Sequence, residues 1–376
     1  MKTIYVLRSM YLPNSAVTNR LFGHLRAFSE AGWHVEMTFL SPNPQRAKVD
    51  IEIPNVTFNY CWEDSSVSNR YLKALQSYWF AWKYVKSLPS GANVLLLGMA
   101  DYFQIFLSRK DINVYYEITE HPSLGRPSGF LGRKGLERHF RQCRQLKQIF
   151  VISTPLRDCY IENGIDAEKV TIVNMTVDPV RFQGLVKTEG IERYIAYCGT
   201  ASNNKDGVDE LLKAFAITHK THPDVKLYII GATPSVKDEA GNLKLIDDLG
   251  IKDAVVFTGI VPAHEMPQLL KDAAVLALDR PDSLQARHGF ATKIGEYLLT
   301  GNPVVVTSVG DFPKFLQDGV SAYLSDERNA EMFASKLNQA LDNPEEAAKI
   351  GECGKQVALD NFDCITEGRK FLEAIK

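Results

Sequence analysis

The sequence predicts an α/β protein with two domains, each built on a parallel sheet covered by helices. Short apolar runs rich in β-branched side chains alternate with segments of helical apolar spacing along most of the chain. That alternation is typical of βαβ units. The chain has 376 residues, which is enough for two domains. Hydrophobic residues make up 45% of it and charged residues 23%, an ordinary balance for two buried cores.

Composition excludes several classes of protein. The net charge is −2, so no overall positive field favours nucleic acid as a partner. The six cysteines are scattered without a C-x-x-C motif, so we expect no metal site and no disulfide scaffold. A reduced, cytoplasmic protein is the simplest interpretation. The first ten residues lack the apolar core of a signal peptide. No apolar run approaches the roughly 20 residues of a membrane-spanning helix, so we expect any membrane contact to be peripheral.

The first domain is expected to begin with a strand, a helix and a second strand. Helical spacing of Leu21, Leu25 and Phe28 defines the helix. The expected strands of this domain lie at 2–7, 34–40, 94–97, 114–118, 149–152 and 170–173. Glu120 and His121 follow the strand at 114–118. Polar residues just past the carboxyl end of a parallel strand lie where open α/β sheets bind ligands. Both are therefore candidate catalytic residues, although a loop histidine is commonly structural.

A basic segment follows at 126–147. It contains seven Lys or Arg residues and one acid, Glu137, in a chain that is slightly acidic overall. Phe130 and Leu131 are among the apolar residues between the charges. One interpretation is a solvated helix face. The other, which we favour, is a surface for anionic lipid headgroups or for a lipid-pyrophosphate acceptor.

Residues 274–278 and 323–324 are expected to complete the second domain, and amphipathic helix follows at 327–376. The strands of this domain are predicted at 194–198, 225–230, 255–258 and 304–307. Gly199, Gly231 and Gly259 directly follow the first three of them. Glycine permits close backbone approach where a strand turns toward a ligand.

The most informative stretch is 287–310. A loop containing Gly289 leads into a helix expected to start near Thr292 and to end at Gly301, which suits a left-handed helix cap. Lys293 lies in the first turn, where the helix dipole favours anions, and this conflict suggests a bound anion such as a phosphate. Glu296 lies one turn later and is able to accept hydrogen bonds from sugar hydroxyls. The alternative is an ordinary surface Lys–Glu pair.

These residues resemble the donor-site signature of glycosyltransferases of the GT4 type, within the GT-B superfamily. In that signature two glutamates eight positions apart precede a small residue, Gly, any residue, Pro, Val and Val. Glu296 matches the second glutamate and 301–305 matches the tail, while His288 occupies the first glutamate position. Residues 292–298 resemble variants of this signature. The stretch 174–182 is similar to the family segment that ends the first domain.

The resemblance implies a GT-B fold, with two Rossmann-like domains facing a cleft. The acceptor-side domain would span 1–185, together with a C-terminal helix at about 360–376 that crosses back to it. The nucleotide-sugar donor domain would span 191–358. The donor would be a substrate, with no tightly bound cofactor and no required metal.

The resemblance also implies roles for particular residues. Lys205 and Lys293 would neutralise the donor diphosphate, and Thr200 stands where the family has an arginine. His121 would lie near the reacting sugar. The implied donor-binding residues are Gly199, Thr200, Lys205, Gly231, Ile260, His288, Phe290, Ala291, Thr292, Lys293 and Glu296.

We therefore expect a retaining glycosyltransferase that moves a sugar to a hydroxyl in polysaccharide or glycolipid synthesis. Its partners would be a nucleotide sugar and a sugar or lipid-linked acceptor, with contact to the inner face of an anionic membrane compatible with the basic segment. Two alternatives stay open. One is a GT-B nucleotide-sugar epimerase. The other is a non-catalytic sugar-nucleotide-binding protein, which is compatible with the departures from the family pattern at Thr200 and His288.

Overall fold

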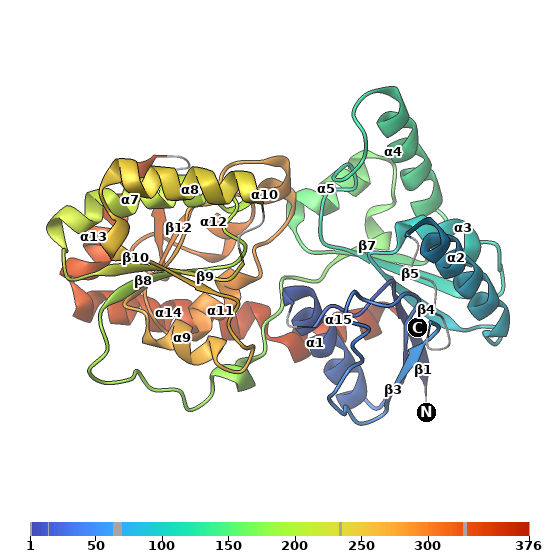
Figure 1. Cartoon of the computed structure of the whole chain (residues 1–376). Coiled ribbons are helices and arrows are strands. Elements are labelled where there is room, and N and C mark those ends of the chain that lie inside the picture. The colour runs from blue at the N-terminus through green and yellow to red at the C-terminus, as the bar shows by residue number, and fades with distance from the viewer. Residues whose placement is uncertain (1, 14, 63–69, 233–234, 326–328, 376) are drawn as a thin grey trace. The chain divides into compact units, whose positions relative to one another are not determined.

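The computed structural model describes residues 2–13, 15–62, 70–232, 235–325 and 329–375 (Figure 1). The chain divides into two compact units, one of residues 1–174 and 364–376 and the other of residues 175–363. Each contains one parallel sheet covered by helices on both faces, as the sequence predicts. Within the described residues no helix combines the length and the hydropathy needed to cross a bilayer.

The first unit is built on a seven-stranded sheet in the order β3-β2-β1-β4-β5-β6-β7. All of its strand pairs are parallel. Its strands are β1 Thr3–Arg8, β2 His34–Phe39, β3 Val56–Tyr60, β4 Asn93–Leu97, β5 Asn113–Ile118, β6 Gln148–Val151 and β7 Val170–Ile172. Its α-helices are α1 Ala16–Glu30, α2 Arg70–Ser87, α3 Phe103–Phe106, α4 Phe130–Cys143, α5 Thr154–Glu162 and α15 Cys364–Ala374, with a 3-10 turn, η1, at Ala100–Tyr102.

The sequence did not predict β3 or α2. Strand β3 is short and largely half-buried at one edge of the sheet, so it lacks the apolar run of a central strand. Helix α2 carries large apolar side chains on its exposed side as well as its buried side, which blurs the amphipathic pattern.

The last helix, α15, returns to the first unit as expected and packs closely on α1. A Cβ atom on Gly23 would come within 2.7 Å of the Cys364 Cβ, and one on Gly368 within 2.4 Å of the Ala27 Cβ. The two glycines thus allow the helix backbones to approach. Phe371 of α15 fills the resulting core, with its ring centroid 4.3 Å from that of Phe150.

The second unit is built on a six-stranded sheet in the order β10-β9-β8-β11-β12-β13, also parallel throughout. Its strands are β8 Tyr194–Cys198, β9 Lys226–Ile230, β10 Val255–Gly259, β11 Val275–Leu278, β12 Val304–Thr307 and β13 Tyr323–Ser325. Its α-helices are α6 Asn203–Asp206, α7 Val208–Thr221, α8 Val236–Leu249, α9 Met266–Asp272, α10 Leu284–His288, α11 Lys293–Leu299, α12 Phe312–Phe315, α13 Ala330–Asp342 and α14 Pro344–Phe362. Strands β11 and β12 are completely buried, which explains their continuous apolar sequences.

The units meet at a different residue from the expected domain boundary of 185. The segment from Met175 belongs with the second unit because it packs on α11. A Cβ on Gly295 of α11 would lie 2.4 Å from Val177 and 2.7 Å from Met175. Arg181, in the 3-10 turn η3 (Pro179–Phe182), forms an ion pair with Glu296 of the same helix. The second unit also extends to Asp363, five residues past the expected 358.

Candidate functional site

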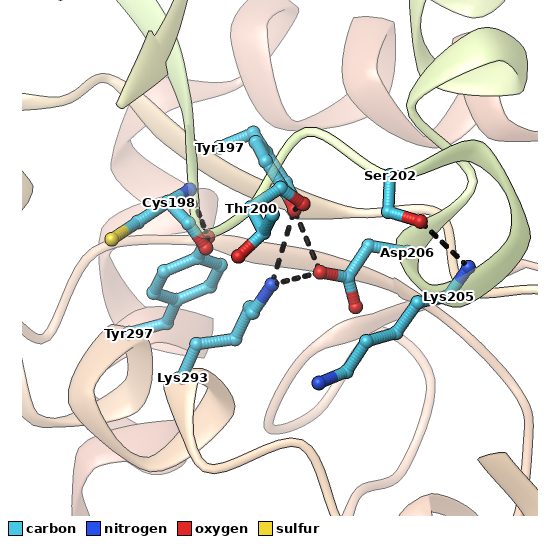
Figure 2. A network of polar contacts seen from close by, with 8 residues as sticks. All are labelled: Tyr197, Cys198, Thr200, Ser202, Lys205, Asp206, Lys293 and Tyr297. Carbon is cyan, nitrogen blue, oxygen red and sulfur yellow. Dashed lines mark hydrogen bonds and ion pairs between the residues drawn. The ribbon is translucent and has the colours of Figure 1, made fainter. Parts of the chain in front are cut away.

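The carboxyl end of β8 carries a compact polar network, drawn in Figure 2. Lys293, at the start of α11, donates a hydrogen bond from Nζ to Asp206 Oδ2 at 2.7 Å. The Tyr197 hydroxyl, at the end of β8, lies 2.7 Å from the same carboxylate oxygen and 3.3 Å from Lys293 Nζ. Carboxyl ends of parallel strands are where open α/β sheets bind ligands. The network therefore lies where this fold places its sites.

Burial shapes the charges of this network. The Asp206 side chain is almost fully buried and that of Lys293 is only 16% exposed. Burial alone would raise the Asp206 pKa, but the Lys293 charge and the hydrogen bonds from Lys293 and Tyr197 lower it below its ordinary value. Burial lowers the pKa of Lys293, and attraction to Asp206 opposes that shift. The carboxylate is therefore ionised and holds the amino group in place.

The anion beside Lys293 is thus a side chain of the same unit. The sequence predicted an anion at this position because a lysine in the first helical turn opposes the helix dipole. Asp206 supplies that anion and was not among the predicted site residues. The signal that could have identified it was an acidic residue beside Gly207, in a loop expected to bind a phosphate.

Glycines make the network possible. Gly199 has φ of 148°, and a Cβ there would lie 2.4 Å from Lys293 Nζ. Gly231 has φ of 123°, and a Cβ there would lie 2.3 Å from the carbonyl oxygen of Gly199. The loops after β8 and β9 therefore touch through their backbones, and a larger residue at Gly199 would displace the lysine.

Lys205 is placed differently from Lys293. It lies on the short helix α6, which Ser202 caps by accepting a hydrogen bond from the Lys205 backbone N–H at 3.4 Å. Its side chain is exposed, and no dashed line reaches its amino group in Figure 2. Lys205 and Lys293 flank Asp206, one in the sequence and the other by direct contact.

Tyr297 supports the network from below. Its hydroxyl accepts a hydrogen bond from the Cys198 backbone N–H at 2.6 Å, and its ring is fully buried. This contact ties α11 to the end of β8. It holds in register the two elements that carry Lys293 and Tyr197.

Glu296 accepts a hydrogen bond from the Arg181 guanidinium, and the two side chains are each about four-fifths buried. The sequence predicted Glu296 as a ligand for sugar hydroxyls and did not predict Arg181 as its partner. The Glu296 carboxylate has a second oxygen and keeps acceptor capacity beyond this pair. The pairing fixes its position on α11.

The remaining predicted donor residues are spread over four loops of the second unit. His288 donates from Nδ1 to the Leu284 carbonyl oxygen at 3.0 Å, which orients its ring. Thr200 is exposed and Ile260 is 79% exposed. Thr292 adopts helical backbone angles before α11 without a capping side-chain hydrogen bond.

Phe290 and Ala291 are buried. The Phe290 ring packs in the core, with its centroid 4.9 Å from the Phe312 ring and 5.4 Å from the Phe362 ring. Its side chain thus anchors the loop before α11.

His121 and Glu120 belong to the first unit. The His121 Nδ1 accepts a hydrogen bond from the Ser123 backbone N–H at 3.2 Å and lies 2.7 Å from the Ser123 hydroxyl. Nε2 therefore carries the proton, and it lies 3.3 Å from the Cys159 Sγ. Glu120 is exposed beside it. The His121 ring is half-buried, and its contacts with Ser123 fix its orientation.

A cavity of about 610 Å³ in the second unit lies away from these residues. It is lined by 185–188, by residues just before β8, β11 and β12, by the end of α13 and by part of α14. These positions are at the amino ends of the strands. None of the predicted donor residues lines it, so we assign the site from the polar network and not from this cavity.

Residues 186–357 match the family model described as glycosyl transferases group 1. This region contains the entire network of Figure 2. Residues 186–357 are a glycosyl transferases group 1 domain. The GT4-type resemblance predicted from the sequence is confirmed.

Part of the chain is also similar in sequence to characterised glycosyltransferases. The chain is 28% identical over 187 residues to a GDP-mannose-dependent alpha-(1-6)-phosphatidylinositol monomannoside mannosyltransferase of Mycolicibacterium smegmatis, covering 49% of this chain and 48% of that protein. It is 26% identical over 230 residues to an MMP alpha-(1->4)-mannosyltransferase of Mycolicibacterium hassiacum, covering 60% and 53%. The chain spans about half the length of the curated relatives it matches.

Solved structures match over the whole chain and confirm the GT-B fold. Anabaena HepE in complex with UDP superposes with a TM-score of 0.76 at 16% identity, covering 100% of this chain and 99% of that one. TarM superposes with a TM-score of 0.78 at 13% identity, covering 100% and 98%. At these identities the comparison establishes the fold.

Proposed function

We propose that the protein is a retaining glycosyltransferase that moves a sugar from a nucleotide-sugar donor to a hydroxyl acceptor in polysaccharide or glycolipid synthesis. The observation that carries this proposal is the match of 186–357 to the glycosyl transferases group 1 model, over the region that contains Lys293, Asp206 and Glu296. The mannosyltransferase relatives and the UDP complex of a structural neighbour support a nucleotide sugar as donor.

In the proposed reaction the bond from the anomeric carbon to the diphosphate oxygen breaks, and its electron pair stays on the diphosphate. The acceptor oxygen bonds to the anomeric carbon, and its proton passes to the leaving diphosphate. Negative charge grows on the leaving diphosphate. Lys293 and Lys205 are the cations that we propose to stabilise it, because preorganised charge in a partly buried site lowers the barrier most where charge develops.

Asp206 gives Lys293 a defined position before the donor arrives. The Lys293 amino group has three donors, and Asp206 and Tyr197 engage two of them. Within the described part of the chain no hydrogen bond takes the third, and we propose that it binds a diphosphate oxygen. Glu296 is the residue that we propose to bind the donor ribose, and His121 the one that we propose to assist transfer at the sugar.

The direct test is to incubate the protein with labelled UDP- and GDP-sugars and an acceptor extract. We expect release of the nucleoside diphosphate together with label in an acceptor. An epimerised sugar without acceptor label would support the epimerase alternative. Tight binding of a nucleotide sugar without turnover would support the non-catalytic alternative. Thermal shift with the same donors identifies the preferred base beforehand, because a bound donor stabilises the fold by mass action.

A lipid-linked acceptor is the finer part of the proposal. On α4, Arg133, Lys134 and Arg141 are exposed, and Phe130 and Leu131 are 61% and 72% exposed beside them. Arg138 donates to Gln104, and Arg144 donates to backbone carbonyls at the end of α5. A basic surface with exposed apolar residues suits an anionic lipid interface. We expect cosedimentation with anionic vesicles that salt weakens and that charge reversal of Arg138 and Arg141 removes.

A further inference from the structure

A second helix of the first unit presents an apolar surface that neither the fold nor the proposed reaction explains. Helix α2 exposes Leu75, Trp79 and Trp82 by 67%, 52% and 49%. Their spacing of four and then three residues places them on one face of the helix. Ser77, Ala81 and Val85 are buried on the other side. The helix therefore anchors itself to the unit by one face and presents large apolar side chains on the opposite one.

The exposed face of α2 is also positively charged. From Leu72 to Ser87 the sequence has three lysines and no acid. Lys86 Nζ lies 3.5 Å from the Trp82 ring centroid, and Lys83 Nζ lies 5.5 Å from that of Trp79. Two cations thus border the tryptophan rings directly, so any partner must accept both apolar and positive surface.

This surface is continuous with the basic helix α4. Tyr78 of α2 stacks on Tyr102 of η1 with ring centroids 4.9 Å apart. Arg138 of α4 donates to Gln104 of the adjoining α3 at 2.5 Å. Helices α2, α3 and α4 all belong to crossovers that advance in the same direction along the sheet, so right-handed connections place them on one face. Both exposed apolar clusters, on α2 and on α4, therefore belong to the same helical layer.

We propose that α2 is an interfacial helix that docks on an anionic lipid surface, with Trp79 and Trp82 inserted at the headgroup level. Tryptophan is favoured at that depth, and lysines beside it suit anionic headgroups. A second copy of this chain fits less well, because a symmetric α2–α2 contact would bring like charges together. The proposal deepens the membrane contact proposed for α4 and rests on that partner, whereas it does not depend on sugar transfer.

The chain carries its own reporter for this contact. It has four tryptophans. Trp33 and Trp62 are buried, so Trp79 and Trp82 of α2 are the solvent-accessible ones. With vesicles of phosphatidylcholine and phosphatidylglycerol we expect a blue shift of tryptophan emission and quenching by lipids brominated in their acyl chains. Both signals should be absent with phosphatidylcholine alone and should weaken at high salt.

Three variants test the assignment by cosedimentation with the same vesicles, which does not depend on the tryptophan signal. Trp79→Ser with Trp82→Ser removes the apolar contact, and Lys83→Glu with Lys86→Glu reverses the charge. The charge reversal should weaken vesicle binding by at least about tenfold, because each basic residue near an anionic surface contributes about a fivefold factor. The tryptophan pair should also weaken it by about tenfold or more, because it removes the apolar area that the interface would bury. Val236→Ser with Lys237→Glu is the matched control, since Val236 is 84% exposed on the acidic helix α8 of the other unit. It should bind like the unmodified protein.

The outcomes separate the proposals. If the α2 variants bind vesicles normally and emission does not shift, while the Arg138 and Arg141 reversal abolishes binding, the α2 assignment is overturned and the α4 contact stands. If the unmodified protein does not bind anionic vesicles, both contacts are overturned. Concentration-dependent self-association that the tryptophan variant abolishes, without vesicle binding, would identify a second copy as the occupant. Donor binding is measured by calorimetry on each variant. It shows that the variant is folded, and it tests the proposed function separately from vesicle binding.

Discussion

Each unit of the molecule buries a charged cluster at the carboxyl end of a parallel strand, and the two clusters differ in how completely they are satisfied. In the first unit, Arg20 donates to Glu117 at 2.8 Å and to the backbone carbonyls of Asn174 and Val173 at 2.6 and 3.0 Å. His24 lies 3.1 Å from the same Glu117 oxygen. In the second unit, the Lys293 amino group donates hydrogen bonds to two side chains, those of Asp206 and Tyr197. Among these contacts, the first cluster uses main-chain acceptors and the second does not.

That difference separates a structural ion pair from a functional one. A guanidinium whose donors face fixed carbonyls cannot turn to a ligand without leaving buried groups unsatisfied. The Lys293 side chain is 16% exposed, against 6% for Arg20, and a lysine ammonium can redirect its three donors where a planar guanidinium cannot. A buried ion pair is therefore weak evidence of function by itself. Whether its partners are fixed backbone carbonyls or side chains is what separates a structural pair from a functional one.

The largest expected effect is loss of stability in the first cluster. Glu117→Gln should lower the free energy of unfolding by about 3–5 kcal/mol, because it leaves the buried Arg20 charge without its carboxylate. Urea unfolding measures this. Asp111→Asn is the control, since the Asp111–Arg109 pair lies at the solvent-exposed surface and should contribute little to stability. Equal stability of the two variants would contradict the assignment of Glu117 as structural.

Glu117→Gln should also change how the free energy of unfolding depends on pH. Burial would raise the Glu117 pKa, but Arg20 and His24 outweigh it and lower the pKa from 4.5 to about 2. A carboxyl with a depressed pKa stabilises the fold above its unfolded pKa and loses that contribution as pH falls through the folded value. Acid should therefore weaken the unmodified protein between about pH 4.5 and 2. Glu117→Gln should flatten this part of the stability profile.

In the second cluster the large effect should fall on turnover. Lys293→Met combined with Asp206→Asn removes both charges and leaves no unpaired one. We expect turnover to fall by about 10²–10³-fold, the range for loss of a preorganised group that stabilises developing charge. Stability should change much less than with Lys293→Met alone, which strands Asp206. Lys205→Ala should lower turnover without destabilising the fold. Unchanged turnover in both lysine variants would exclude the proposed role.

Glu296 tests the ribose contact. Glu296→Ala should weaken nucleotide binding by about 1.5–3 kcal/mol, the range for a hydrogen bond to a charged group. Calorimetry with UDP and GDP measures it. Arg181→Ala is the matched variant, because it breaks the same ion pair and keeps the carboxylate. If both variants lose affinity equally, the Arg181–Glu296 pair acts as a structural brace and the contact is not to ribose.

The smallest effect is expected at His121. His121→Ala should lower turnover by about fivefold to tenfold, as for loss of one hydrogen bond of about 1 kcal/mol or slightly more. The free energy of unfolding should be nearly unchanged, since the ring is half-buried and its contacts are with Ser123 of its own loop and with Cys159 of α5. Glu120→Gln is the companion variant. A defect confined to it would transfer the role to Glu120.

The sequence by itself determined the periodicity of strands and helices and the signature at 287–310. Apolar runs such as Val304–Thr307 can form little other than buried strands, and glycines such as Gly301 mark helix ends. These are local properties of the sequence, so the parallel sheets and the resemblance to group 1 glycosyl transferases could both be predicted from them. Lys293 and Glu296 were predicted for the same reason, as neighbours on one helix.

Only the tertiary structure decided the partners of those residues. Asp206 and Lys293 are 87 positions apart, and Arg181 and Glu296 are 115 apart. Glu117 lies within an apolar strand and gains its meaning from Arg20, 97 positions earlier. Such pairs form because burial requires each charge to find a partner, and the chain path between the two ends carries no local signal of that requirement. The exposed tryptophan face of α2 is of the same kind, since spacing alone cannot tell which side of a helix the core covers.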